Sequence, residues 1–349
     1  CIRDRGSPGR LLPGWWRSRW PHGRIGEAKN PGPSSTGSSV LSLASPVSSP
    51  RSGSDSDLSC PSDDVLPAAP HATVYAGLPP ADPAGEHTVV FANCSHVITQ
   101  AAHLASIPFH TLFLAEHSLP PQRHPDFHAS YPTFYAKHLS TLDAERRHGT
   151  AGTGILHRLG PRHPVHRPAP RHPELRKLNH TGRIGLYGIE PIPGVLLLVY
   201  VIYGYTNGEN SNDAADRTSA LLEIALADAA KQPPGPWAIV GDLNADVYSD
   251  PPTLSPIVAA LASGRLIDMG DRASHYASGP DREPTCKAHN SQHRTRRDYF
   301  LVSPDSLPLI NDFRVLRDTG LPVHYALSVT FKNKLDDTPP WTNSGSLCP

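Results

Sequence analysis

Residues 237–246 read Trp-Ala-Ile-Val-Gly-Asp-Leu-Asn-Ala-Asp, an apolar run that stops abruptly at acidic and amide side chains. Its first four residues have the aromatic and β-branched character of a buried strand, and Gly241 is expected to let the backbone turn tightly. Asp242 and Asn244 are two residues apart, so in extended chain their side chains point the same way. Ligands of α/β sheets bind at such strand ends. The stretch therefore indicates a strand ending at a functional site, although a strand before an ordinary Asp/Asn turn would look the same.

Two earlier strands of the predicted fold end in the same way. The apolar run 88–92 is followed by Asn93, and the run 111–115 is followed by Glu116. Either residue alone would be read as a cap or a surface residue. Together with the carboxylate and amide after the later strand, they indicate one site at the ends of several strands.

The remaining elements are predicted from apolar periodicity and from capping and turn residues. Three helices are expected: one with Ser95 as N-cap and running to Ser106, one over 213–230, and a short one with Ser255 as N-cap, Pro256 at its first position and Gly264 past its end. The further expected strands are one that follows a tight turn within 149–156, then 184–189 and 195–203, which form a hairpin, and finally 296–303 and 326–331. Residues 158–180 are rich in Pro, His and Arg without periodicity, which predicts a loop.

Composition divides the 349 residues into three parts. Residues 1–86 are dominated by Pro, Ser and Gly and hold too little apolar surface to offset the entropy of ordering, so we expect a disordered leader. Residues 87–332 carry all the periodic segments and form the expected domain. Residues 333–349 form a polar tail.

The charge and cysteine content limit the class of protein. Lys+Arg and Asp+Glu number 32 each, so the chain has no net charge that would attract polyanions. Contact with nucleic acid must therefore come from local basic patches. The five Cys are scattered without metal or disulfide spacing, which favours a reducing, intracellular compartment. The longest apolar run, 195–203, is too short to span a bilayer, so no membrane partner is expected.

The sequence resembles the endonuclease/exonuclease/phosphatase superfamily, which has the DNase I-like fold of apurinic endonucleases, non-LTR retrotransposon endonucleases and inositol-phosphate phosphatases. The resemblance spans residues 87–331. The segments that carry it, in family order, are Phe91-Ala92-Asn93, Leu114-Ala115-Glu116, Val201-Ile202-Tyr203 followed by Asn207, Gly241-Asp242-Leu243-Asn244, Arg296-Arg297-Asp298-Tyr299 and a late His324. It implies an α+β four-layer sandwich, with two mixed β-sheets face to face and helices outside.

The resemblance also implies roles in Mg²⁺-dependent phosphodiester hydrolysis, for which Mn²⁺ could substitute. Glu116, assisted by Asn93, would bind the metal, because Mg²⁺ prefers oxygen ligands. Asp242 would orient and deprotonate the attacking water, and Asn244 would hold it in line. His324 would contact the scissile phosphate, with Asp298 fixing its tautomer. The remaining predicted residues are Tyr203, as a donor to a phosphate oxygen or else a core tyrosine, and Asn207 and Arg296, as substrate-binding residues.

Two departures from the family pattern affect the prediction. Ala115 stands where the family usually has Gln, and Val323 stands where it usually has the Asp before the last His. The loss of that carboxylate implies either a single-metal enzyme of reduced activity or a decaying copy.

The disordered leader followed by an endonuclease-like domain resembles the start of a retrotransposon polyprotein, which implies DNA as partner and a nuclear location. The alternatives that stay open are an inositol or lipid phosphate phosphatase and a catalytically impaired nucleic-acid-binding remnant.

Overall fold

The structure is a computed structural model that describes residues 85–143, 151–158, 164–178, 181–206, 208, 211–248, 254–276, 279–287 and 293–334. Nearly all of the expected leader and nearly all of the expected tail lie outside the described residues, so both remain predictions. Asn207 also lies outside them.

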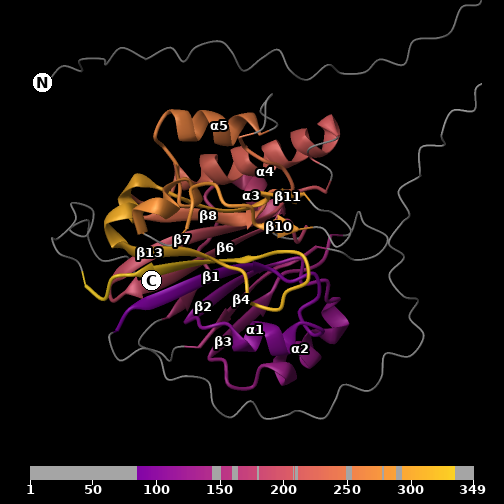
Figure 1. Cartoon of the computed structure of the whole chain (residues 1–349). Coiled ribbons are helices and arrows are strands. Elements are labelled where there is room, and N and C mark those ends of the chain that lie inside the picture. The colour runs from indigo at the N-terminus through magenta and orange to yellow at the C-terminus, as the bar shows by residue number, and fades with distance from the viewer. Residues whose placement is uncertain are drawn as a thin grey trace, which may run out of the picture. The chain divides into compact units, whose positions relative to one another are not determined.

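Two mixed sheets of six strands form the centre of the domain (Figure 1). The first sheet has the order β13-β14-β1-β2-β4-β3 and the second β5-β6-β7-β8-β12-β9. The strands of the first sheet are β1 (His87–Asn93), β2 (Thr111–Ala115), β3 (Ala136–Leu139), β4 (Thr153–His157), β13 (Ile310–Leu316) and β14 (Ala326–Phe331). Those of the second are β5 (Val165–His166), β6 (Ile184–Ile192), β7 (Val195–Tyr203), β8 (Trp237–Asp242), β9 (Ile267–Asp268) and β12 (Asp298–Val302). A separate short hairpin pairs β10 (Cys286–Lys287) with β11 (Arg294–Thr295).

Helices cover the outer faces of both sheets. The α-helices are α1 (Ala101–Ser106), α2 (His124–Ser130), α3 (Pro173–Leu178), α4 (Asn212–Ala229) and α5 (Ser255–Ala262), and the 3₁₀ helices are η1 (Pro121–Arg123), η2 (Gly270–Tyr276) and η3 (Pro304–Leu309). In Figure 1, α3, α4 and α5 lie beyond the second sheet, and α1 and α2 lie beyond the first. The expected four-layer sandwich is confirmed.

Three apolar clusters hold these layers together. One lies between the sheets and includes Phe91, Phe113, Val201 and Phe300. A second joins the outer face of the second sheet to α3, α4 and α5, and a third joins the outer face of the first sheet to α1 and α2. The alternation of side chains along each strand therefore supplies both an inner and an outer apolar face.

Each sheet contains one parallel pair, and the two pairs determine where the site lies. Strands β1 and β2 are parallel, with Asn93 opposite Ala115, and strands β7 and β8 are parallel, with Tyr203 opposite Asp242. The carboxyl ends of parallel strands meet at one edge of a sheet. Asn93 and Glu116 therefore share an edge of the first sheet, and Tyr203 and Asp242 share an edge of the second.

Three local predictions were wrong. Ser95 is not a helix N-cap: its φ is +54°, its backbone N–H bonds to the side chain of Asn93, and α1 begins only at Ala101. The predicted loop 158–180 contains β5, which pairs with β6, and α3, whose Leu175 is buried against the α4 layer. Both elements are too short to show periodicity. At α5 the cap position is Leu254, and Ser255 already belongs to the helix.

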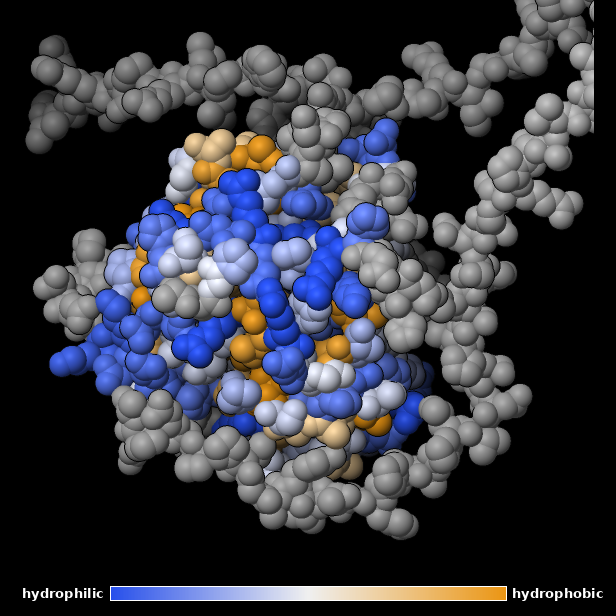
Figure 2. Space-filling view, viewed as in Figure 1, coloured by the Kyte–Doolittle hydropathy of each residue, from blue (hydrophilic) through white to orange (hydrophobic). Residues whose placement is uncertain are grey.

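The surface in view is mostly hydrophilic, with an apolar patch over α5 at the top of Figure 2. This helix is built from Pro, Ile, Val, Ala and Leu after its first residue, so its outward side is also apolar. Within the described part of the chain, no helix is both long enough and apolar enough to cross a membrane.

Candidate active site

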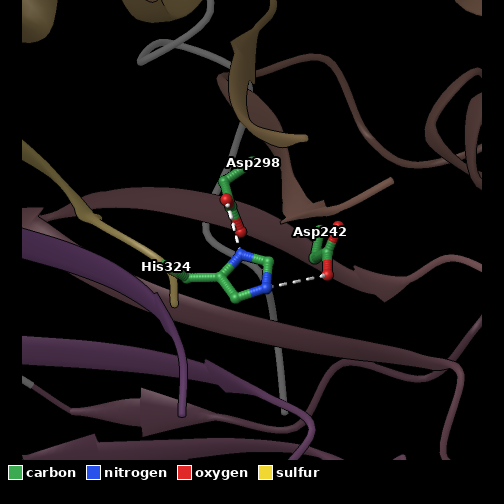
Figure 3. Close-up of side chains that lie close together, drawn as sticks. All are labelled: Asp242, Asp298 and His324. Carbon is green, nitrogen blue, oxygen red and sulfur yellow. Dashed lines mark hydrogen bonds and ion pairs between the residues drawn. The ribbon is translucent and has the colours of Figure 1, made fainter. Parts of the chain in front are cut away.

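Four predicted residues from different parts of the chain meet at the strand ends. Asn93 Nδ2 donates to Asp242 Oδ2 across 2.8 Å, which joins the end of β1 to the end of β8. His324, in the loop before β14, places Nδ1 2.9 Å from Asp298 Oδ2 and Nε2 3.9 Å from Asp242 Oδ2. Figure 3 shows the imidazole ring between the two carboxylates. All four residues are buried.

The strand pairing explains why the two carboxylates lie together. Asp298 begins β12 and is directly opposite Asp242 at the end of the neighbouring strand β8. Thr285 supports this end of β12, since its hydroxyl accepts from the backbone N–H groups of Arg297 and Asp298, at 3.1 and 2.9 Å. Thr285 was not predicted, because a lone Thr in a polar stretch carries no sequence signal.

Gly241 has a different role from the predicted one. It lies inside β8 rather than in a turn, and a Cβ there would be 2.1 Å from the backbone oxygen of Ile202 on β7. The turn comes later, at Asn244, whose φ is +53°. Its backbone N–H donates to Asp242 Oδ1 across 2.8 Å, and its Nδ2 donates to the oxygen of Gly204 across 3.2 Å. The amide is thus fixed beside Asp242 by hydrogen bonds rather than by extended-chain alternation.

The electrostatics of the cluster favour a charged imidazole. Burial alone would lower the pKa of His324, but the carboxylates of Asp298 and Asp242 outweigh it and raise that pKa to about 10. Both ring nitrogens of His324 therefore carry protons at neutral pH. Burial raises the pKa of Asp242; His324 opposes this shift, while the carboxylates of Asp298 and Glu116 add to it. Asp298 thus stabilises an imidazolium rather than selecting one neutral tautomer.

Glu116 lies beside this cluster, on a backbone that is held in an uncommon conformation. Its φ is +54° and its side chain is half-buried. The next residue, His117, is fully buried: its Nδ1 accepts from the backbone N–H of Leu119 and its Nε2 donates to the oxygen of Ser140, both at 3.1 Å. Burial lowers the pKa of His117 to about 3, so its ring is neutral. His117 thereby fixes the turn that carries Glu116, a role that the sequence did not suggest.

The donor set is compatible with a divalent metal ion. Carboxylate and amide oxygens are hard ligands, and Mg²⁺ is commonly bound through one or two carboxylates. Among the described residues, one group of three has metal-compatible spacing: ligand atoms of Asp242, Asp298 and His324 lie within 4.8 Å of one another. The Glu116 carboxylate and the Asn93 amide oxygen, which follow neighbouring parallel strands of the first sheet, are a second set of oxygen donors that could hold such an ion.

Two of the predicted residues lie deeper than their expected roles suggest. Tyr203 is 1% exposed in the cluster between the sheets, with the Arg183 guanidinium 4.7 Å from its ring centre. Arg296 is 5% exposed, and its Nη2 lies 2.6 Å from Oδ1 of the buried Asp268. The structure therefore gives Arg296 a partner inside the protein rather than a position facing a substrate.

Gly152→Ala is expected to destabilise the domain, because a Cβ there would lie 2.1 Å from Nε2 of His117 and the φ of Gly152 is +99°. Such backbone conformations cost about 1–3 kcal/mol for other residues, and about 1 kcal/mol lowers the melting temperature of a domain this size by roughly 2–4 °C. Gly194→Ala is the matched control, since its φ is +77° with no atom within 4 Å. Thermal unfolding should show a clearly larger drop for Gly152→Ala; equal drops would mean that the His117 contact is unimportant.

Comparisons with known proteins identify the family and the fold of the chain. The profile described as "Endonuclease/Exonuclease/phosphatase family" matches residues 91–316, so the chain belongs to that family. No curated protein matches the sequence.

Among solved structures, the 3′ phosphatase NExo from Neisseria bound to a product DNA hairpin is 19% identical with a TM-score of 0.52, and the match covers 70% of this chain and 99% of that one. The catalytic domain of APE2 from Xenopus laevis is 15% identical with a TM-score of 0.55, over 70% and 91% of the two chains. The AP endonuclease LMAP from Leishmania major is 16% identical with a TM-score of 0.52, over 73% and 90%. At these identities the likeness concerns the fold, and it confirms the predicted DNase I-like architecture.

Proposed function

We propose that this protein hydrolyses phosphodiester bonds with Mg²⁺, or Mn²⁺ in its place, and that it is a DNA endonuclease of retrotransposon origin acting in the nucleus. The observation that carries the proposal is the buried cluster of Asn93, Asp242, Asp298 and His324 beside Glu116. Hydrolysis of a phosphodiester requires neutralisation of the phosphate oxygens, a group that activates water and a donor to the reacting phosphate. These residues supply all three.

Each residue then has a role that follows from its position. Glu116 and Asn93 would hold the ion, which when bound would neutralise charge on the phosphate oxygens. Asp242 orients and deprotonates the attacking water, and Asn244 holds that water in line. His324 donates from its imidazolium to a phosphate oxygen, and Asp298 stabilises this charged form.

A basic hairpin beside the site supports a nucleic-acid substrate. Strand β10 reaches His324, because Cys286 forms an isolated antiparallel bridge with that residue and the backbone N–H of Lys287 donates to the oxygen of Val323 across 2.9 Å. Lys287 is exposed, as is Arg294 on the partner strand. Cationic side chains at this position would contact the phosphate backbone on either side of the scissile bond.

The experiment that tests the proposal offers the full chain three substrates in parallel with Mg²⁺: supercoiled plasmid, single-stranded RNA and inositol phosphates. Nicking of the plasmid is expected. Release of phosphate from inositol phosphates, without nicking, would establish the phosphatase alternative. Binding of DNA without any turnover would identify an impaired remnant, which the Val323 departure favours.

Val323→Asp is expected to raise the turnover of plasmid nicking, by roughly 10-fold if the added carboxylate helps to activate water or bind a second ion. Val323 is half-buried and directly precedes His324, so the new charge would lie one residue from the cluster along the chain. Val323→Asn is the neutral control of the same shape. The melting temperature is measured beside the rate, because a partly buried charge costs stability. A folded Val323→Asp variant no faster than Val323→Asn would show that the missing carboxylate does not limit the enzyme.

A further inference from the structure

The site is divided between the two sheets. Asn93 and Glu116 follow strands of the first sheet, whereas Asp242 and Asn244 follow a strand of the second. A metal ion on one side and a water-activating carboxylate on the other can cooperate only if the sheets are held in one relative position. The hydrogen bond between Asn93 and Asp242 joins the two sheets on one side of Glu116, toward β14. A second contact between the sheets is needed on the other side of Glu116, toward β3.

Arg183 supplies that contact. It directly precedes β6 of the second sheet and is 0% exposed, and its Nε donates across 2.8 Å to Oδ2 of Asp143, which is 4% exposed. Asp143 follows β3 of the first sheet, after Ser140, which bonds to the turn of His117. The ion pair therefore connects the second sheet to the part of the first that supports Glu116.

The same guanidinium reaches the other half of the site. Arg183 Nη1 donates to the oxygen of Gly204 across 2.9 Å, and that oxygen also accepts from Asn244 Nδ2 at 3.2 Å. The backbone N–H of Gly204 donates in turn to the oxygen of Asp242 across 2.7 Å. Two tyrosine rings flank the guanidinium, those of Tyr203 at 4.7 Å and Tyr205 at 4.5 Å, and limit its movement.

We propose that Arg183 is a positioning residue that aligns the Glu116 half of the site with the Asp242–Asn244 half. This inference rests on the proposed function. A guanidinium presents several donors in a rigid plane, so it can hold Asp143 and Gly204 at once, whereas the ammonium of Lys is a point charge on a flexible stem. A buried ion pair contributes little net stability compared with apolar residues of the same volume, so stability alone does not account for it.

The test compares the full chain with Arg183→Lys, which keeps the charge but loses the fixed two-acceptor geometry. We expect kcat for plasmid nicking to fall by on the order of 10- to 100-fold, because a displacement of about 1 Å has effects of that size, while KM changes less than about twofold. Arg158→Met is the control: Arg158 is half-buried at the opposite edge of the first sheet, where it donates to the oxygen of Ala105 and lies 4.0 Å above the Phe109 ring. Its kcat should equal that of the parent.

A double-mutant cycle separates positioning from a loss of stability. If Arg183 acts through the Gly204 carbonyl on Asn244, then Arg183→Lys should reduce kcat much less in an Asn244→Ala background than in the parent. Asp143→Asn, which keeps an acceptor for Nε, should reduce kcat less than Arg183→Lys. Fully additive effects, or an unchanged kcat in folded Arg183→Lys, would overturn the inference.

Hydrogen exchange gives a readout that does not depend on activity. Arg183→Lys should speed amide exchange at residues 203–206 and 242–244, and Arg158→Met should not. If the parent chain proves inactive on every substrate, the proposed function fails, and this exchange still decides whether Arg183 fixes the two segments. Unchanged exchange there would contradict the inference.

Discussion

Asp242→Asn is expected to reduce the rate of Mg²⁺-dependent plasmid nicking by on the order of 10²–10⁴, the usual contribution of a positioned general base. Asn has almost the same shape but a single acceptor oxygen, so it can accept from only one of the two donors that Asp242 binds, the amide of Asn93 or the backbone N–H of Asn244. The melting temperature is therefore measured beside the rate. What is lost is the group that takes a proton from water. Single-turnover nicking by equal amounts of folded protein measures the effect.

Asp246→Asn is the matched control for this substitution. Asp246 is half-buried four residues further along, where its carboxylate accepts from the backbone of Tyr248 and from the hydroxyl of Tyr299. An Asn side chain can accept both bonds, so the rate should stay close to that of the parent. Folded Asp242→Asn that nicks as fast as Asp246→Asn would remove Asp242 from the mechanism.

Glu116→Gln is expected to produce the second large effect, on metal binding. The substitution removes the ligand charge without changing the size of the side chain, and Mg²⁺ depends strongly on carboxylate charge. The affinity for Mg²⁺ should fall by at least about 10-fold, since even groups that only support metal ligands are typically worth about 10–100-fold. Isothermal titration with Mg²⁺ and with Mn²⁺ measures the change.

The exposed Glu223 on α4 provides the control for Glu116. Glu223→Gln removes the same charge away from the strand ends, so it should leave both the affinity and the nicking rate unchanged. Unchanged affinity in Glu116→Gln would place the ion elsewhere, with the Asp242, Asp298 and His324 group as the next candidate.

The sequence was most informative where an apolar strand ended at a polar residue. The strand 111–115 was predicted with its observed bounds and β1 to within a residue at each end, whereas β8 continues to Asp242, beyond the turn expected at Gly241. Such strands are buried on both faces, so their continuous apolar character is visible locally. The edge strand β13 was missed, because it carries Asn311, Asp312 and Arg314, and such polar residues are frequent on exposed edges.

The prediction of the site was incomplete, because some of its contacts are not encoded in any local sequence pattern. The family resemblance implied that Arg296 binds substrate, yet Arg296 is buried against Asp268, 28 residues earlier in the chain. Arg183 shows the converse: it looks like an ordinary residue before a strand, and only the packing of the two sheets places it beside Asp143 and Gly204. Residue type at a strand end indicates where chemistry is placed, whereas the partners of a buried cation depend on the tertiary fold.

The most direct test of the proposed metal-dependent mechanism is the nicking of supercoiled plasmid by the full chain as the concentration of Mg²⁺ is raised from zero. We predict that nicking is absent in a chelator, rises with Mg²⁺ to a plateau, and is lost in Asp242→Asn at every concentration, while Glu116→Gln needs far more Mg²⁺. Nicking that persists in the chelator, or that both variants carry out at the rate of the parent, would contradict a metal-dependent reaction at this site.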